Sequence, residues 1–225
     1  MIHVGMVDSK RLLLKPLIEQ AKAGGAINIL SAYITGLARS GYEEVVDELL
    51  ESWREEPSFA LHTLMIIWRV GANDKRINWL IEDLEKGNLD PDAVGCLALA
   101  SWGRQSKPEP MKKLIETLAK FPSITPEITA LDLILERSEQ EFDLLEPTLV
   151  DLIKGLAAKK LTGMSDYTWE QGCKLLLKRR RVKEVIEAAI IAIESSEDYG
   201  SDEHALRVLE EAVASDPPEV WGGIA

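Results

Sequence analysis

The sequence predicts an all-α fold in the form of an α-solenoid, a right-handed superhelix of antiparallel helix pairs. Apolar residues recur 34 residues apart along the middle of the chain, and glycine or proline interrupts the helical patterns at the same interval. No stretch alternates apolar and polar residues between hairpin turns, as a half-buried strand would. A period of roughly 20–50 residues built from two helical patterns is typical of stacked helix pairs that bury their apolar faces against each other.

The period is clearest in the second helix of each pair. Two sets of apolar positions repeat there at intervals of 34 or 35 residues: Val46, Leu80, Leu114 and Leu149, and then Leu50, Leu84, Leu118 and Ile153. In the first helices, Ile34, Trp68 and Trp102 are separated by the same 34 residues. We therefore expect four helix-pair repeats of about 34 residues over 26–155.

An N-terminal cap helix is expected within residues 1–25. Ser9 can accept a hydrogen bond at its N-terminus, the apolar residues from Leu12 to Ala21 fall on one face, and Gly24-Gly25 ends it. Residues 1–8 carry little helical signal.

The four repeats have predicted boundaries at turn residues. The first pairs 26–39 with 42–54, and the second pairs 58–70 with 75–86, before Gly87. The third opens at Asp90-Pro91, turns through 103–110 and ends near Lys120; the fourth opens at Thr125-Pro126 and is divided by Ser138 and Pro147.

A more irregular helical region is expected over 156–225. Its predicted helices are 167–180, 182–195 and 201–215, and a further helix opens after Pro217-Pro218, which suggests a fragment of a longer protein. Together these segments predict one α-helical repeat domain over 1–225.

The composition indicates a cytoplasmic protein. The net charge is −12, two cysteines cannot form a disulfide framework, and no leader or long apolar run is present. We therefore expect neither secretion nor a membrane partner. An acidic surface also repels nucleic acid, unless its charge is distributed unevenly.

The charge is indeed uneven, because residues 154–183 carry nine basic side chains and only two acidic ones, Asp166 and Glu170. The segment has a net charge of +7, and the rest of the chain therefore carries −19. The basic residues are Lys154, Lys159, Lys160, Lys174, Lys178, Arg179, Arg180, Arg181 and Lys183.

Three interpretations of this basic segment stay open. Its cations can complement a helix C-terminus and acidic neighbouring repeats, they can dock an acidic protein surface, or they can bind phosphate with Tyr167 and Trp169 nearby for stacking. Trp68 and Trp102 either pack between repeats or form an aromatic ladder on one face. The candidate partner-binding residues are Lys174, Lys178, Arg179, Arg180, Arg181, Lys183, Tyr167, Trp169, Trp68 and Trp102.

Evidence for catalysis is weak in the sequence. His3, His62 and His204 are far apart and have no metal-ligand spacing, and no nucleotide-binding, metalloprotease or nucleophile motif occurs. We expect no catalytic residue, cofactor or metal. An enzyme with a hidden carboxylate site is a third alternative.

The helix-pair period resembles that of tetratricopeptide, HEAT and armadillo solenoids. The small-residue and Gly-Tyr positions of the tetratricopeptide pattern are not regularly filled, so the resemblance is closest to HEAT-like repeats. Such solenoids imply binding of a partner along a concave face, with no chemistry of their own. The C-terminal run HALRVLEEAVASDPPEVW, which begins at His204, is similar to helical sensor regions of bacterial STAND ATPases.

These observations together predict a non-catalytic protein–protein interaction scaffold or sensor module. The alternative is a helical nucleic-acid-binding protein that uses the basic segment 154–183. Self-association is a further alternative, because the acidic helix around 43–56 and the basic stretch 174–183 could pair head to tail between copies.

Overall fold

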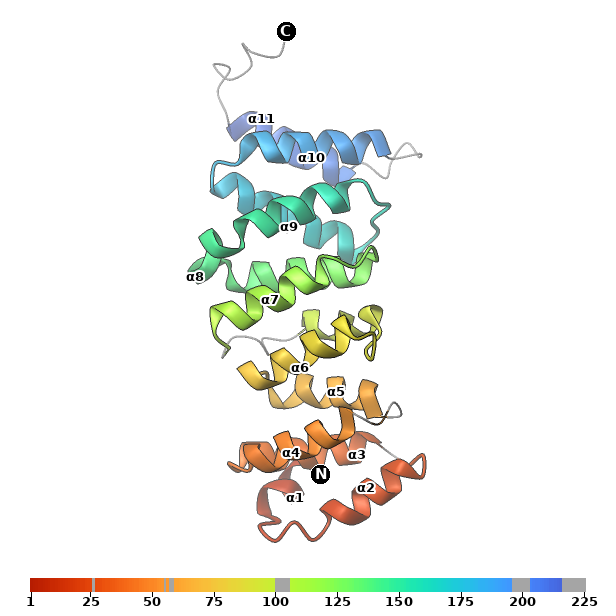
Figure 1. The fold of residues 1–225 in the computed structure, drawn as a ribbon. Coiled ribbons are helices and arrows are strands. Elements are labelled where there is room, and N and C mark those ends of the chain that lie inside the picture. Colours follow the sequence, from red (N-terminus) through yellow and green to blue (C-terminus); the bar gives the residue numbers. More distant parts are fainter. Residues whose placement is uncertain (26, 55, 57–58, 100–105, 196–202, 216–225) are drawn as a thin grey trace. The chain divides into compact units, whose positions relative to one another are not determined.

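All regular elements of the structure are helices. The computed structural model describes residues 1–25, 27–54, 56, 59–99, 106–195 and 203–215, and no strand occurs in those ranges, which confirms the all-α class (Figure 1). The elements are α1 (Ile2–Val7), α2 (Leu14–Lys22), α3 (Ile27–Arg39), α4 (Glu43–Arg54), α5 (Ala60–Val70), α6 (Asp74–Glu85), the 3-10 helix η2 (Pro91–Leu99), α7 (Pro108–Leu118), α8 (Ile124–Ala157), α9 (Met164–Lys178), α10 (Val182–Ser195) and α11 (Glu203–Ser215).

The chain divides into two compact units, Met1–Leu114 and Ile115–Ala225. Each predicted helix at 26–39, 42–54, 58–70, 75–86, 167–180, 182–195 and 201–215 corresponds to an observed helix. Trp102 and the helix expected after Pro217 lie outside the described residues. The single domain over 1–225 stays a prediction.

The N-terminal region differs from the prediction in two respects. Residues 2–7, which carry little helical signal, form α1. Ser9 does not cap α2; instead Asp8 accepts hydrogen bonds from the backbone N–H groups of Leu12 and Leu13, and from the Tyr33 hydroxyl at 2.8 Å. The Leu13 hydrogen bond is the largest of several that hold the pKa of Asp8 below its ordinary value.

The third and fourth repeats also differ from the sequence pattern. Asp90 caps the segment that begins at Pro91 by accepting from the Asp92 N–H, as predicted, but the segment is a 3-10 helix. The fourth opens at Ile124, with Ser123 rather than Thr125 at the N-cap position.

Helix α8 continues through both Ser138 and Pro147, which were predicted to divide it. Its only non-helical backbone position is Glu141, with φ −127° and ψ 17°. Pro147 has no N–H to donate to the carbonyl of Asp143, but the turns on either side keep the helical path. A single kink at Glu141 therefore stands in place of the two divisions predicted at Ser138 and Pro147.

Several helices end in the same hydrogen-bonded closure, in which one residue adopts a left-handed conformation. Gly41 (φ 86°) closes α3 and Gly87 (φ 72°) closes α6. Arg180 (φ 61°) has the same role after α9: its N–H donates to Leu177 and the next N–H donates to Leu176. An arginine therefore occupies a position that glycine adopts with less strain.

Helix α3 lies at the centre of the first unit, where it packs against α1, α2, α4 and α5. Gly5 and Gly36 allow α1 to approach it closely. A Cβ atom added at Gly36 would lie 2.1 Å from the carbonyl oxygen of Ile2 and 2.9 Å from the Cα of Gly5. The contact between α1 and α3 therefore depends on the absence of side chains at both glycines.

Ion pairs join α4 to α6 in the first unit. Arg76 is 2% exposed; its Nε donates to Asp47 at 2.7 Å and its Nη1 to the carbonyl of Gly71 at 2.8 Å. The Arg54 guanidinium also binds Asp83, with Nε–Oδ2 at 2.8 Å, and lies over the ring of Trp79.

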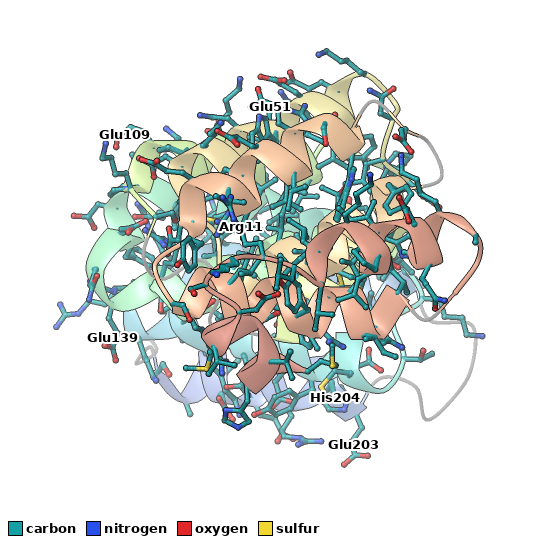
Figure 2. All side chains as sticks on the ribbon, turned by 90° about the horizontal axis from the view of Figure 1, so that it is seen from below. Arg11, Glu51, Glu109, Glu139, Glu203 and His204 are labelled. Carbon is teal, nitrogen blue, oxygen red and sulfur yellow. The ribbon has the colours of Figure 1, made fainter. Side chains whose placement is uncertain are left out.

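The predicted acidic surface around 43–56 is partly neutralised. Asp47 binds Arg76, Glu51 binds Lys75 at 3.1 Å, and Glu56 binds Lys22 at 2.7 Å. Glu51 still projects from α4 (Figure 2), with a side chain 57% exposed.

The second unit contains helices α8, α9, α10 and α11, together with the last residues of α7 from Ile115 onward. Helix α9 contacts α8, α10 and α11, and α10 contacts α8 and α11 (Figure 1). Gly172 lets α9 approach α8 closely, because an added Cβ would lie 2.6 Å from Ile153 Cδ1.

All eight apolar positions that define the period of the second helices are buried. None is more than 3% exposed: Val46, Leu50, Leu80, Leu84, Leu114, Leu118, Leu149 and Ile153. Burial at a constant spacing indicates that these residues supply the inward face of their helices.

The Gly36→Ala substitution tests the contact between α1 and α3. We expect it to lower the free energy of unfolding by about 1–3 kcal/mol, because the methyl group overlaps the backbone of Ile2. Urea unfolding followed by circular dichroism measures this change. Unchanged stability would show that α1 does not pack on α3 in solution.

Gly155→Ala is the matched control. Gly155 is exposed within α8, and an added Cβ would have no neighbour within 4 Å. Alanine should therefore raise the free energy of unfolding by about 0.5–1 kcal/mol through its higher helix propensity.

Candidate functional site

An open groove on the second unit is the candidate functional site. It has a volume of about 640 Å³, and its lining comes from α8, α9 and α11, with α9 in the middle. The lining residues are Leu135, Ser138, Gln171, Lys174, Leu175, Leu177, Lys178, Glu211 and Ser215.

Helical periodicity explains why these residues lie together. Gln171, Lys174, Leu175 and Lys178 are spaced 0, 3, 4 and 7 along α9, which places them on one face. On α8, Leu135 and Ser138 are three residues apart, and on α11 the two lining residues, Glu211 and Ser215, are four apart. Leu135, Leu175 and Leu177 are half-buried and supply the apolar part of the lining.

A buried carboxylate, that of Glu170, fixes the position of the groove residue Lys174, which forms a polar wall of the groove together with Glu211. Glu170 is 3% exposed and accepts Lys174 Nζ at 2.7 Å, while its other oxygen lies 2.5 Å from His204 Nδ1. Burial raises its pKa, but the hydrogen bonds from Lys174 and His204 outweigh burial, so the pKa of Glu170 is lowered overall. His204 lies on α11 beside Glu203, which projects into solvent (Figure 2).

The Lys174 ammonium therefore forms its ion pairs within the protein. Besides Glu170, its ammonium binds Glu211 on α11 at 3.2 Å. The hydrogen bond to Glu170 is the main cause of a raised Lys174 pKa, which keeps the side chain charged. Lys174 connects α9 to α11 at the groove.

Two groove side chains have no partner in the part of the chain that the structure describes. Lys178 is exposed and forms no ion pair there, and the Gln171 amide forms no hydrogen bond. By contrast, Ser138 and Ser215 each donate to a carbonyl of their own helix. Lys178 and Gln171 are thus the polar groups of the groove that stay free to bind a ligand.

Most of the predicted basic segment is paired with carboxylates. Lys154 binds Glu187 at 2.6 Å, and the hydrogen bond that its ammonium donates to this carboxylate raises the pKa of Lys154. The remaining pairs in the segment are Lys159 with Glu127, Lys174 with Glu170 and Glu211, Arg181 with Glu146 and Glu184, and Lys183 with Glu187. This pattern supports the interpretation in which the cations complement acidic neighbouring helices.

The other four basic residues lie apart from carboxylates in the described structure. The Arg179 guanidinium lies 4.4 Å from the ring centroid of Phe142. Lys160, Lys178 and Arg180 are exposed without an anionic partner there. Of the six basic residues predicted to bind a partner, the groove contains only Lys174 and Lys178.

The predicted aromatic residues have different environments. Tyr167 is 53% exposed, whereas Trp169 is 2% exposed and donates its indole N–H to the carbonyl of Ile153 at 3.0 Å. Trp169 is therefore part of the core in this structure, so no ring face is accessible for stacking. Trp68 is half-buried, and Trp102 is outside the described residues.

Asp132 on α8 is a half-buried carboxyl that the sequence pattern did not point to. Burial raises its pKa from 3.8 to about 6, and the Thr168 hydroxyl donates to it at 3.3 Å. It does not line the groove. The signal that could have identified it is its position between apolar residues in the run Ala130-Leu-Asp-Leu-Ile134.

The described residues contain no group of three or more His, Cys, Asp or Glu side chains placed to bind a metal ion. In the same part of the chain, no helix has the length and apolar character needed to cross a membrane. No family model, no curated protein and no solved structure matches the sequence or the fold.

Asp132 predicts a pH dependence of stability. Its folded-state pKa lies above that of the unfolded chain, so the folded state gains stability from its proton below pH 3.8 and loses it as the pH rises through about 6. We expect Asp132→Asn to be more stable than the wild type at pH 7.5, by on the order of 1 kcal/mol after allowance for partial solvent access.

Urea unfolding of both proteins at pH 4 and pH 7.5 measures this difference, which should shrink at the lower pH. A carboxyl-carbon NMR titration of Asp132 checks the cause directly. A midpoint near 4 in that titration would contradict the prediction.

Proposed function

We propose that the chain is a non-catalytic recognition module, a HEAT-like solenoid scaffold or sensor that binds a segment of a partner protein. The groove formed by α8, α9 and α11 is the observation that carries this proposal. It combines half-buried leucines with the side chains of Lys178 and Gln171, which have no partner among the described residues. Apolar lining with a few polar groups that fix orientation is typical of binding sites.

Packing within each unit supports the solenoid part of the proposal. In the first unit α3 contacts α5 and α5 contacts η2; in the second, α8 contacts α9 and α9 contacts α11. Polar contacts also join residues about one repeat apart, such as Asp47 with Arg76, Lys154 with Glu187 and Glu170 with His204. Contacts between neighbouring pairs are what a stacked repeat requires.

Site-specific photocrosslinking tests the proposed function. With p-benzoylphenylalanine at position 171, we expect irradiation in the source cells to give discrete adducts with a partner protein, because Gln171 lines the groove. The same residue at position 160 is the control, since Lys160 is exposed but is not part of the groove.

A partner identified by mass spectrometry is then purified and titrated against the wild type and a Leu175→Glu variant, in which a charge enters the apolar lining. Adducts that are identical from positions 171 and 160, or affinity that is unchanged by Leu175→Glu, would argue against the groove.

Nucleic-acid binding is the second candidate function, because Lys160, Lys178 and Arg180 are exposed without an anionic partner in the described residues. Several other cations of the basic segment are already paired with carboxylates. We therefore expect fluorescence anisotropy to show no binding of single- or double-stranded oligonucleotides at near-physiological salt.

Arg180→Gly is the informative variant for this measurement. Glycine suits the left-handed backbone at position 180, so the substitution removes one charge without adding strain. Wild-type binding that weakens steeply with salt, with a smaller salt dependence in Arg180→Gly, would favour the nucleic-acid function instead.

A further inference from the structure

We propose that the groove of the second unit binds an acidic segment of a partner protein that also carries large apolar side chains, with a carboxylate of that segment paired to Lys178. This inference rests on the proposed function and specifies the chemistry of the partner. Its basis is the balance of charge along the groove.

The groove lining contains three charged side chains, Lys174, Lys178 and Glu211, and therefore carries a net charge of +1. Glu211 accepts Lys174 at 3.2 Å, and Lys174 also binds the buried Glu170 at 2.7 Å. Lys178 is one helical turn further along α9 and has no carboxylate partner among the described residues. The charge available to a ligand is therefore positive, and a carboxylate is its complement.

Glu170 is bound by Lys174 but is not itself a lining residue of the groove. Glu170 accepts Lys174 at 2.7 Å, lies 2.5 Å from His204 Nδ1 and 3.9 Å from Arg207, and is 3% exposed, so it presents little negative charge at the groove surface. Among the described lining residues Glu211 is the one carboxylate, and it is paired with Lys174, so an incoming carboxylate is expected to avoid this wall. It would contact Lys178 at the end of α9.

The apolar part of the groove selects the other side chains of the segment. Leu135 on α8 and Leu175 and Leu177 on α9 are half-buried, so each leaves apolar surface accessible. A leucine, isoleucine or phenylalanine of the ligand would cover this surface. Gln171 can meanwhile donate to a backbone carbonyl of the ligand or accept from its N–H.

Selection from a phage-displayed library of random 12-residue peptides on the full chain tests this inference. We expect the enriched peptides to combine Asp or Glu with Leu, Ile or Phe. Selection on Lys178→Glu should lose the acidic residues and favour Lys or Arg. Lys160→Glu is the matched control, because it reverses another exposed lysine of the same unit and should leave the selection unchanged.

A synthetic peptide from the wild-type selection should bind Lys178→Glu about five- to tenfold more weakly, because an exposed ion pair is replaced by repulsion. Equal binding by Lys160→Glu and the wild type should accompany this loss. Circular dichroism confirms that each variant is folded.

Several outcomes would overturn the inference. They are the absence of enriched peptides, enrichment without acidic residues, and the same peptides selected by Lys178→Glu. Peptides without acidic residues that still block crosslinking from position 171 would overturn the acidic preference while the groove remained a binding site. Failure of crosslinking itself would instead remove the proposed function.

Discussion

Burial of one apolar stripe per helix against a neighbouring helix is the constraint on which the structure depends. The helices are mostly about 9–15 residues long, a length at which an isolated helix is only marginally stable in water. Leu50 shows the result: it is fully buried, although Glu51 and Ser52, the next two residues of the same helix, are exposed. The position of a helix is therefore set by the stripe that it shares with its neighbours, and the polar faces stay available for other contacts.

Ion pairs between helices favour one alignment of each helix along its neighbour, in addition to the apolar packing. Arg76 binds Asp47 on α4 and the carbonyl of Gly71, so a single side chain ties α6 both to α4 and to the end of α5. Glu170 has a similar position between α9 and α11 in the second unit. A buried ion pair is not a strong source of net stability, because desolvation offsets the attraction. A shift of one helix along the other would leave a buried charge unpaired, and that cost favours a single alignment.

The sequence predicts those parts of the fold that depend on local signals. Gly41 and Gly87 mark helix ends because the left-handed closure is a property of a few consecutive residues. Helix α1 could not be predicted from the sequence, because it is positioned by a contact between Gly5 on α1 and Gly36 on α3. That contact is known only from the structure.

The candidate site depends on the same kind of long-range information. The groove brings together helices that begin about 40 residues apart in sequence, so its outline cannot be read from any one of them. The basic segment was visible in the sequence, but its carboxylate partners come from other helices, as with Lys154 and Glu187. The number of basic residues in the sequence therefore identifies the segment 154–183. Only the structure distinguishes the lysines that are paired with carboxylates from Lys178.

The position of Lys178 in the last turn of α9 has an independent explanation, since a cation there interacts favourably with the helix dipole. That interaction accounts for a positive charge at the helix end, but it does not explain why the Lys178 side chain lies in the groove. Arg179 lies over Phe142 and Arg181 binds Glu146, so neighbouring cations of the same helix end are directed to other surfaces. Lys178 alone continues the face that contains Gln171, Lys174 and Leu175. A contribution to helix stability and a contribution to ligand binding are compatible, because the dipole interaction leaves the ammonium exposed and able to donate to a carboxylate.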